Sequence, residues 1–294
     1  PVALTVYASA SSPLSKTYRR TDDGRIEKKA AAHMTAGTAR LVEVPFSGLG
    51  DLFDSLGPDE ATGYGLFDAA QARIVVDKKA KPPALLARTK EHCRYRARPG
   101  VLMLDHDPHP RGASMRPAEL LAALAAIVPG IADAAVLTRA SVSAGVRIVG
   151  QEPAPASGGY HLFMPVIDAS DIPRFGAVLF RRLWLGGHGY IALARNGALL
   201  VRTCIDGAVF AGERLDFTGR PVIGDGLEWT PPAAEYRHGG YLDTAALPDL
   251  SDAETAAYDA LVAAAKTAAQ PDADKQHADW LGEHGASMRA AGVP

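Results

Sequence analysis

The sequence predicts a protein of the α+β class, and three segments carry this prediction. Residues 101–104 (Val-Leu-Met-Leu) form a continuous apolar run, which is typical of a strand in the middle of a sheet. Residues 172–185 repeat apolar side chains at helical spacing, so we expect an amphipathic helix there. Ser251 and Glu254 stand three residues apart before an Ala-rich stretch, which is the capping-box signal of a helix start.

The first hundred residues are expected to contain short strands joined by polar turns. We expect strands at residues 4–8, 39–45 and 73–76, a short helix around 52–56 and a second helix at 83–93. Asp22-Asp23-Gly24 predicts a turn in the polar stretch between the first two strands. Lys16 lies in the polar stretch of residues 12–20, where we expect a solvated loop; the alternative is a contact with nucleic acid.

The rest of the chain continues with mixed elements and ends in helices. We expect a helix at 117–128, ended by Pro129-Gly130, and strands at 135–138, 146–149, 160–166 and 198–206. The composition changes near Pro231. We therefore expect one large domain over residues 1–230, and a helical appendage or linker over 231–294 with helices at 255–269 and 275–291.

Composition and charge argue against a strongly basic protein, a zinc finger, a secreted protein and a membrane protein. The contents of 47% hydrophobic and 22% charged residues are typical of a soluble globular chain, and 294 residues suffice for a full core. The net charge of -2 gives no overall basic field, so nucleic acid would need a local basic groove. The two cysteines, Cys93 and Cys204, form no Cys-x-x-Cys pair and suit a reducing cytoplasm. Without a signal peptide or a membrane-spanning run, we expect a cytoplasmic protein with no membrane partner.

Two carboxylates follow the apolar run. Because side chains alternate along a strand, Asp105 and Asp107 are expected on one face and His106 on the other. Neighbouring carboxylates repel each other, and a bound divalent cation removes this repulsion. The alternative is a solvated turn or a helix cap, which Asp-x-Asp forms in many folds.

Two further segments supply polar groups for the same kind of site. Gly158 and Gly159 precede His161, where glycine amides can approach an anion and the imidazole can add a donor. Asp206 is expected at the end of a strand, with Arg202 on the same face about 13 Å away at ~3.3 Å per residue. The alternatives are a tight hairpin turn, a structural histidine and surface charges.

The order and spacing of these segments resemble the catalytic motifs of the archaeo-eukaryotic primase superfamily, the primase-polymerases. An Asp-x-Asp strand, a Gly-rich turn with His, and an apolar strand ending in Asp follow one another within residues 100–225. Residues 141–145 resemble the Ser-rich loop before the His motif, and residues 214–221 resemble the segment after the third Asp. Many members have Ser two residues before the His, where this chain has Gly159; Ser157 lies two residues earlier.

The resemblance implies a catalytic palm like an RNA-recognition domain, packed with an amino-terminal α/β subdomain and followed by carboxy-terminal helices. It implies template-directed nucleotidyl transfer on DNA, as a primase or DNA polymerase in replication of a plasmid, phage or integrated element. Asp105, Asp107 and Asp206 would be the catalytic, metal-binding residues for Mg²⁺ or Mn²⁺. The nucleotide, an NTP or dNTP, would be bound by Ser157, Gly158, Gly159, His161, Arg202 and Arg214.

The expected partners are a single-stranded DNA template and a helicase or further domain beyond the carboxyl end. The chain starts without Met and ends on a helical tail, as a fragment of a longer protein would. Two other functions stay open. A metal-dependent nuclease or phosphodiesterase would use the same carboxylates with water as the nucleophile. A non-catalytic nucleic-acid-binding module would need an aromatic stacking pair, and no such motif stands out in the sequence.

Overall fold

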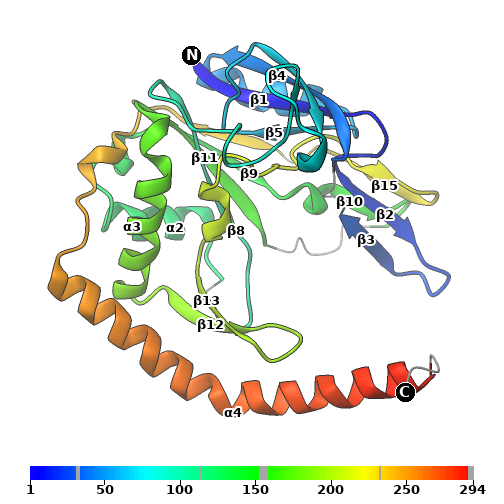
Figure 1. Ribbon diagram of the computed structural model, residues 1–294, viewed down its shortest axis with the longest axis vertical. Coiled ribbons are helices and arrows are strands. Elements are labelled where there is room, and N and C mark those ends of the chain that lie inside the picture. The colour runs from blue at the N-terminus through cyan, green and yellow to red at the C-terminus, as the bar shows by residue number, and fades with distance from the viewer. Residues whose placement is uncertain (31–33, 113, 152–157, 232, 291–294) are drawn as a thin grey trace.

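The computed structural model describes residues 1–30, 34–112, 114–151, 158–231 and 233–290 of the chain (Figure 1). A nine-stranded mixed sheet runs through this part of the chain, together with three sheets of two or three strands. Four α-helices accompany the sheets in the described residues. The expectation of an α+β protein is therefore confirmed.

The elements have the following bounds. The large sheet has the spatial order β16 (Ala234–Arg237), β9 (Val136–Ala140), β11 (Tyr160–Val166), β8 (Gly100–His106), β1 (Val2–Ser9), β4 (Ala36–Val44), β6 (Gln71–Val75) and β7 (Leu85–Leu86), while β5 (Glu60–Gly63) pairs with β1. The small sheets join β14 (Val222–Ile223), β2 (Lys16–Arg20) and β3 (Ile26–Ala30); β10 (Val146–Ile148) and β15 (Leu227–Trp229); and β12 (Gly189–Leu193) and β13 (Leu199–Thr203). The α-helices are α1 (Leu49–Ser55), α2 (Pro117–Ala125), α3 (Ile172–Leu185) and α4 (Asp252–Ala290).

The two halves of the large sheet meet at the first residue of β8. β1 pairs with β8 through one parallel register pair, Ala3 with Gly100, whereas β11 is paired with β8 along its whole length. At the other end of β8, the amide of Asp206 donates to the carbonyl oxygen of Asp105 at 2.9 Å. Residues 204–206 therefore lie along the end of β8 that β1 does not reach.

The central strands have a different core on each face. Leu104 packs with α2 and α3, whereas Met103, its neighbour on β8, packs with α1. On the α1 side the rings of Phe53 and Phe163 lie 4.9 Å apart between centroids. Because side chains alternate along a strand, Asp105 lies on the same side as Met103. The amino-terminal half therefore covers the face that carries Asp105.

Most expected elements are present, and two in the first 206 residues differ in type or length. The helix expected at 83–93 is wrong, because residues 85–86 pair with β6 as a parallel strand and turns follow. The strand expected at 198–206 ends at Thr203, whose hydroxyl donates to the Ile205 carbonyl oxygen and accepts from the Ile205 amide. These bonds turn the chain before Asp206. At residues 85–86, pairing with a distant strand overrides the local pattern, whereas at Thr203 a local side-chain turn ends the strand.

The α-helix expected after residue 231 begins only at Asp252, and a strand and a 3-10 helix precede it. β16 extends the edge of the large sheet, and Leu242 and Leu247 are buried in the core on the α2 and α3 side. The predicted capping box is confirmed, since Ser251 N donates to Glu254 Oε2 at 2.8 Å and Glu254 N donates to Ser251 Oγ at 3.3 Å. The two helices expected after it are one helix, α4, which continues through Pro271.

α4 packs against α3 and β12 through its first half, and Gln276 and His277 reach the turn between β12 and β13. Val262 and Ala269 form a small apolar cluster with Trp184 of α3 and Ile191 of β12. Figure 1 shows the rest of the helix running along one side of the molecule, away from the large sheet. Neither α4 nor another helix in the described ranges is both long and apolar enough to cross a lipid bilayer.

Residues 244–250 are expected to stabilise the fold although α4 follows them. A chain ending at Leu250 keeps Leu247 buried and keeps the bond from Arg174 to the Leu247 carbonyl oxygen, at 2.9 Å. A chain ending at Asp243 loses both. We expect its Tm to be roughly 5–10 °C lower, since burying one Leu contributes about 1.5–3 kcal/mol and each kcal/mol shifts Tm by about 2–4 °C. Thermal unfolding followed by circular dichroism measures this, and equal midpoints would place these residues outside the core.

Candidate carboxylate and histidine site

Three side chains form a row across one face of β8, β11 and β9. Asp105 is the register partner of His161, and His161 is the register partner of Arg139. Nε2 of His161 lies 3.3 Å from Oδ1 of Asp105. Arg139 is 3% exposed and donates to Asp54 of α1 at 2.5 Å. The strands thus bring together Asp105 and His161, which lie far apart in the sequence.

A second carboxylate, Asp216, faces the other nitrogen of the same imidazole. Nδ1 of His161 lies 3.5 Å from Oδ1 of Asp216, and the Tyr64 hydroxyl donates to Oδ2 of Asp216 at 2.5 Å. Two backbone hydrogen bonds join Asp216 to Thr62 of β5. Burial, and then Asp216, raise the pKa of Tyr64 well above its usual value, so its hydroxyl stays a donor. His161 is therefore held from both sides, by Asp105 and by the amino-terminal half.

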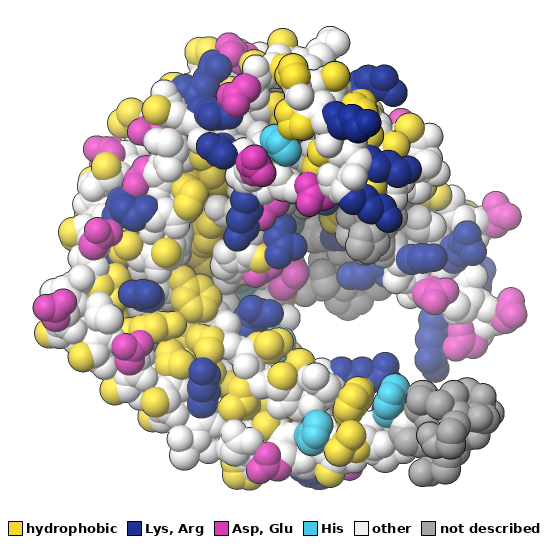
Figure 2. All heavy atoms as spheres, in the orientation of Figure 1, with side chains coloured by type: hydrophobic (Ala, Val, Ile, Leu, Met, Phe, Trp, Pro, Cys, Tyr) yellow, Lys and Arg dark blue, Asp and Glu magenta, His cyan; other side chains and the backbone are white. Residues whose placement is uncertain are grey.

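The electrostatics around Asp105 show how closely the carboxylates gather. Burial is the largest cause that raises the pKa of Asp105 to about 6, and Asp107, Asp216 and Asp206 raise it further. His161 acts in the opposite direction. Figure 2 shows acidic and basic side chains together around the hollow in the middle of the molecule. An additional cation near Asp105 would relieve this repulsion.

Asp107 and Asp206 reach the cluster from chain segments outside strands. Asp107 follows the last residue of β8. Asp206 is exposed and precedes a short 3-10 helix, where its carboxylate accepts from the Ala208 amide at 3.0 Å. The expectation that Arg202, Cys204 and Asp206 share one strand face is wrong, because β13 ends at Thr203 and Cys204 is buried in the core.

His106 has a structural position on the opposite face of the sheet. It is fully buried, its Nδ1–H donates to the Cys204 carbonyl oxygen at 2.6 Å, and its Nε2 accepts from the Met115 amide at 3.2 Å. Its ring lies 4.9 Å from that of Tyr160. His106 therefore fastens two segments to the end of β8: residues 204–206 and the loop that carries Asp107.

Lys16 extends toward the same carboxylates from β2. Its Nζ donates to Ser141 Oγ at 3.1 Å. Burial and Lys28 lower its pKa, while Asp107, Asp105 and Asp216 act to raise it. The expectation of a solvated loop at Lys16 is wrong, because β2 pairs with both β3 and β14. The pairing of β2 with β3 and β14 places Lys16 near these carboxylates.

Arg202, a predicted nucleotide contact, lies on the β12–β13 hairpin. Arg202 faces Tyr190 in the β12–β13 register, and the charges of Arg202, Asp107 and Asp206 all act on the pKa of Tyr190, which burial raises. The hairpin therefore lies beside the acidic cluster.

The predicted phosphate loop is described from Gly158 onward. Gly158 has a φ of +76°, a conformation that favours glycine, and the Gly159 carbonyl oxygen accepts from the Ser141 amide at 2.9 Å. Ser157 lies outside the described residues. Arg214 is exposed, and its side chain makes no ion pair or hydrogen bond with any residue described here.

The donor chemistry fits a divalent cation, but the side chains are not yet arranged as ligands. Carboxylate oxygens are the ligands that Mg²⁺ and Mn²⁺ prefer. Within the described ranges, no three His, Cys, Asp or Glu side chains are placed to share one ion. The reason is local: Asp105 faces His161, and Asp206 caps the Ala208 amide.

Comparison of the chain with models of protein families, with curated proteins and with solved structures found no match. The molecule is an α+β protein with a cluster of carboxylates and one histidine at the junction of its two halves.

Proposed function

We propose that the protein is a metal-dependent nucleotidyltransferase of the primase-polymerase type, acting on DNA in the replication of a mobile element. One observation carries the proposal. The three segments that resemble superfamily motifs lie side by side around β8, with His161 3.3 Å from Asp105 and the Asp206 amide bonded to the Asp105 carbonyl oxygen. If the three resemblances were accidental, the segments would have no reason to lie together in the fold. Their proximity therefore supports a common site.

The topology of the central strands adds support. With the small-sheet strands β10, β12 and β13 set aside, the chain order is β8, α2, β9, β11, α3 and then residues 204–206, while in space β11 lies between β8 and β9. Residues 204–206 lie along β8. This order resembles the strand-helix-strand-strand-helix order of ferredoxin-like and RNA-recognition-like sheets, with residues 204–206, which form no strand, in the place of the last strand. We infer a palm of this kind, with the amino-terminal α/β subdomain joined to it through β1.

The chemistry follows from the residues around Asp105. Asp105, Asp107 and Asp206 would hold Mg²⁺ or Mn²⁺, which when bound would lower the pKa of a 3′-hydroxyl and stabilise the departing pyrophosphate. His161, oriented by Asp216 at Nδ1, would donate to the triphosphate from Nε2, the nitrogen that faces Asp105 in this structure. Lys16 adds a positive charge on the same side, so catalysis rests on positioning and on charge neutralisation.

A single assay tests this function against its alternatives. The protein is incubated with Mn²⁺, labelled nucleotides and single-stranded DNA, with and without an annealed primer. Extended or newly started strands support nucleotidyl transfer. Shortened DNA would instead indicate a nuclease, and retarded but unchanged DNA would indicate a binding module.

His161→Ala is expected to weaken nucleotide use more than DNA binding. The variant removes the imidazole between Asp105 and Asp216, and we expect kcat/KM for the nucleotide to fall by about 10–100-fold, the usual effect of losing an orienting partner in a metal site. Arg214→Ala should raise KM for the nucleotide, because the resemblance assigns it a phosphate contact.

His238→Ala is the matched control, since His238 is exposed and distant in sequence from the site. It should leave kcat, KM and DNA affinity unchanged. If His161→Ala reduces DNA affinity as much as nucleotide use, the imidazole contacts the template or supports the fold instead.

A further inference from the structure

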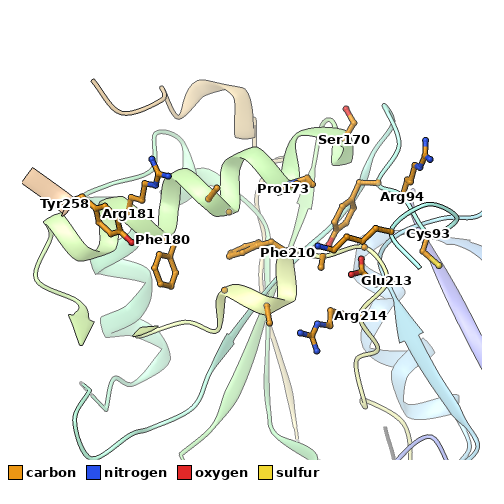
Figure 3. Close-up of a pocket in the computed structure, with 18 residues that line it drawn as sticks. Cys93, Arg94, Ser170, Pro173, Phe180, Arg181, Phe210, Glu213, Arg214 and Tyr258 are labelled. Atoms are coloured by element: carbon orange, nitrogen blue, oxygen red, sulfur yellow. The ribbon is translucent and has the colours of Figure 1, made fainter. Parts of the chain in front are cut away.

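A groove of about 820 Å³ opens between α3, the start of α4 and two loops, residues 90–95 and 207–214 (Figure 3). Close backbone packing fixes its floor. The Gly65 amide donates to the Gly212 carbonyl oxygen at 3.1 Å, and a Cβ on Gly65 would stand only 2.6 Å from that oxygen. Closely packed backbone therefore borders the groove, and apart from Arg214 its lining has no part in the proposed catalysis.

The charges that line the groove are mainly positive. Four cationic side chains and one carboxylate contribute to it: Lys90, Arg94, Arg181, Arg214 and Glu213. All four cations are exposed, and Figure 3 shows Arg181 at one end with Arg94 and Arg214 toward the other. Lys90 and Arg94 form no ion pair with any described side chain. A ligand that spans the groove would therefore carry several negative charges along its length.

Aromatic rings lie between these cations. Phe210 is buried against α3, where Gly176 leaves room for its ring. Phe180 projects from α3 and is only partly buried, with the backbone of Gly207 beneath one edge. At one end, the guanidinium of Arg181 lies 5.6 Å from the centre of the Tyr258 ring. A partly exposed ring beside cations suits an unpaired base, which stacks on aromatic side chains whatever its sequence.

The groove is joined to the carboxylate site through the chain segment that follows Asp206. Gly207 and Ala208, which line it, follow Asp206, and the Asp206 amide is bonded to Asp105. We propose that the groove binds single-stranded DNA, with phosphates on Lys90, Arg94 and Arg181 and a base on Phe180. Its role in leading a strand toward Asp105 rests on the proposed function. A duplex keeps its bases stacked inside and would gain nothing from Phe180.

Fluorescence anisotropy of a labelled oligothymidylate tests the groove. A length of about 12 nucleotides lies within the ~4–16 that comparable sites cover. The full chain is titrated in EDTA without nucleotide, so that no metal-dependent step contributes. The test variant is the double substitution Lys90→Glu and Arg181→Glu. The control is Lys78→Glu with Lys79→Glu, an equal charge change at exposed lysines outside the groove.

We expect the groove double variant to bind the oligonucleotide at least about tenfold more weakly than the control. The slope of log affinity against log salt should fall by about 1.4, since each phosphate contact on a single strand contributes roughly 0.7. Phe180→Ala should weaken binding by about fivefold or more without changing this slope. Circular dichroism checks that each variant is folded.

Other outcomes separate the two proposals. Equal affinity of the groove double variant and the control overturns the groove, as does equal affinity of the wild type for a blunt duplex of the same length. If the wild type incorporates no nucleotide while the groove variants still lose DNA binding, the proposed function fails and the groove stands. If incorporation is normal and the groove variants bind like the control, only the groove fails.

Discussion

Asp105→Asn is expected to abolish nucleotide incorporation and to make the metal-free protein more stable. Incorporation should fall at least about 1,000-fold, as expected when a ligand of the reacting ions is lost. Burial and three nearby carboxylates raise the pKa of Asp105 to about 6, from 3.8. At neutral pH the folded state therefore bears a cost on the order of 3 kcal/mol for ionising this group, which Asn removes.

The pH dependence gives the sign of this effect. Because the folded-state pKa lies above the unfolded value, folding favours the protonated carboxyl group. The destabilisation is fully present above about pH 6 and disappears as the pH falls toward 3.8. The difference in Tm between the variant and the wild type should therefore be largest near about pH 7–8 and small near about pH 4.

Differential scanning calorimetry with and without Mn²⁺ measures both parts. Mn²⁺ should raise the Tm of the wild type, because a ligand that binds the folded state stabilises it, and should have little effect on Asp105→Asn. Asp225→Asn, at an exposed carboxylate in a turn, is the matched control and should change neither activity nor Tm. Normal incorporation by Asp105→Asn would end the metal-site assignment, whatever the stability data show.

Phe53→Ala should lower the free energy of unfolding by about 3–5 kcal/mol, the range for removing a buried aromatic side chain. Phe53 is fully buried, packs on Phe163 of β11 and has the guanidinium of Arg139 5.7 Å from its ring centre. These contacts join α1 to the strands that carry Asp105 and His161. Incorporation should fall as well, because Thr62 and Tyr64 of the amino-terminal half hold Asp216 beside His161.

Urea unfolding at equilibrium measures the change. Phe180→Ala provides the same substitution at a partly exposed ring and should cost less than half as much. A loss below about 1 kcal/mol for Phe53→Ala would mean that the two halves do not depend on this contact. A larger loss at Phe180 than at Phe53 would contradict the burial of the two rings.

Local sequence patterns determined the elements that depend on neighbouring residues. The helix expected at 172–185 and the strand expected at 160–166 have the bounds of α3 and β11, because their apolar residues recur with the periods of a helix and of a buried strand. The capping box at Ser251 likewise acts over three residues. Asp105, Asp107 and His161 could be named from the strand end and the glycine turn that precede them.

Tertiary structure decided where the chain folds against that local pattern. The stretch 83–93 has a helical pattern, yet residues 85–86 pair with β6, which is distant in sequence. Asp206 was expected in a strand, but Thr203 turns the chain before it, and residues 204–206 are held against β8 by His106. Pairing energy between distant strands is invisible in a local pattern, because each strand is stabilised by its neighbour.

The site depends on both levels. The sequence by itself named Asp105 and His161, but their contact required the register of β8 and β11. Asp216 and Lys16 have no local signal for this role, since one depends on β5 and the other on the β2 sheet for its position. Coulomb energy depends on the distance between charges and on their burial, and only the tertiary structure fixes both.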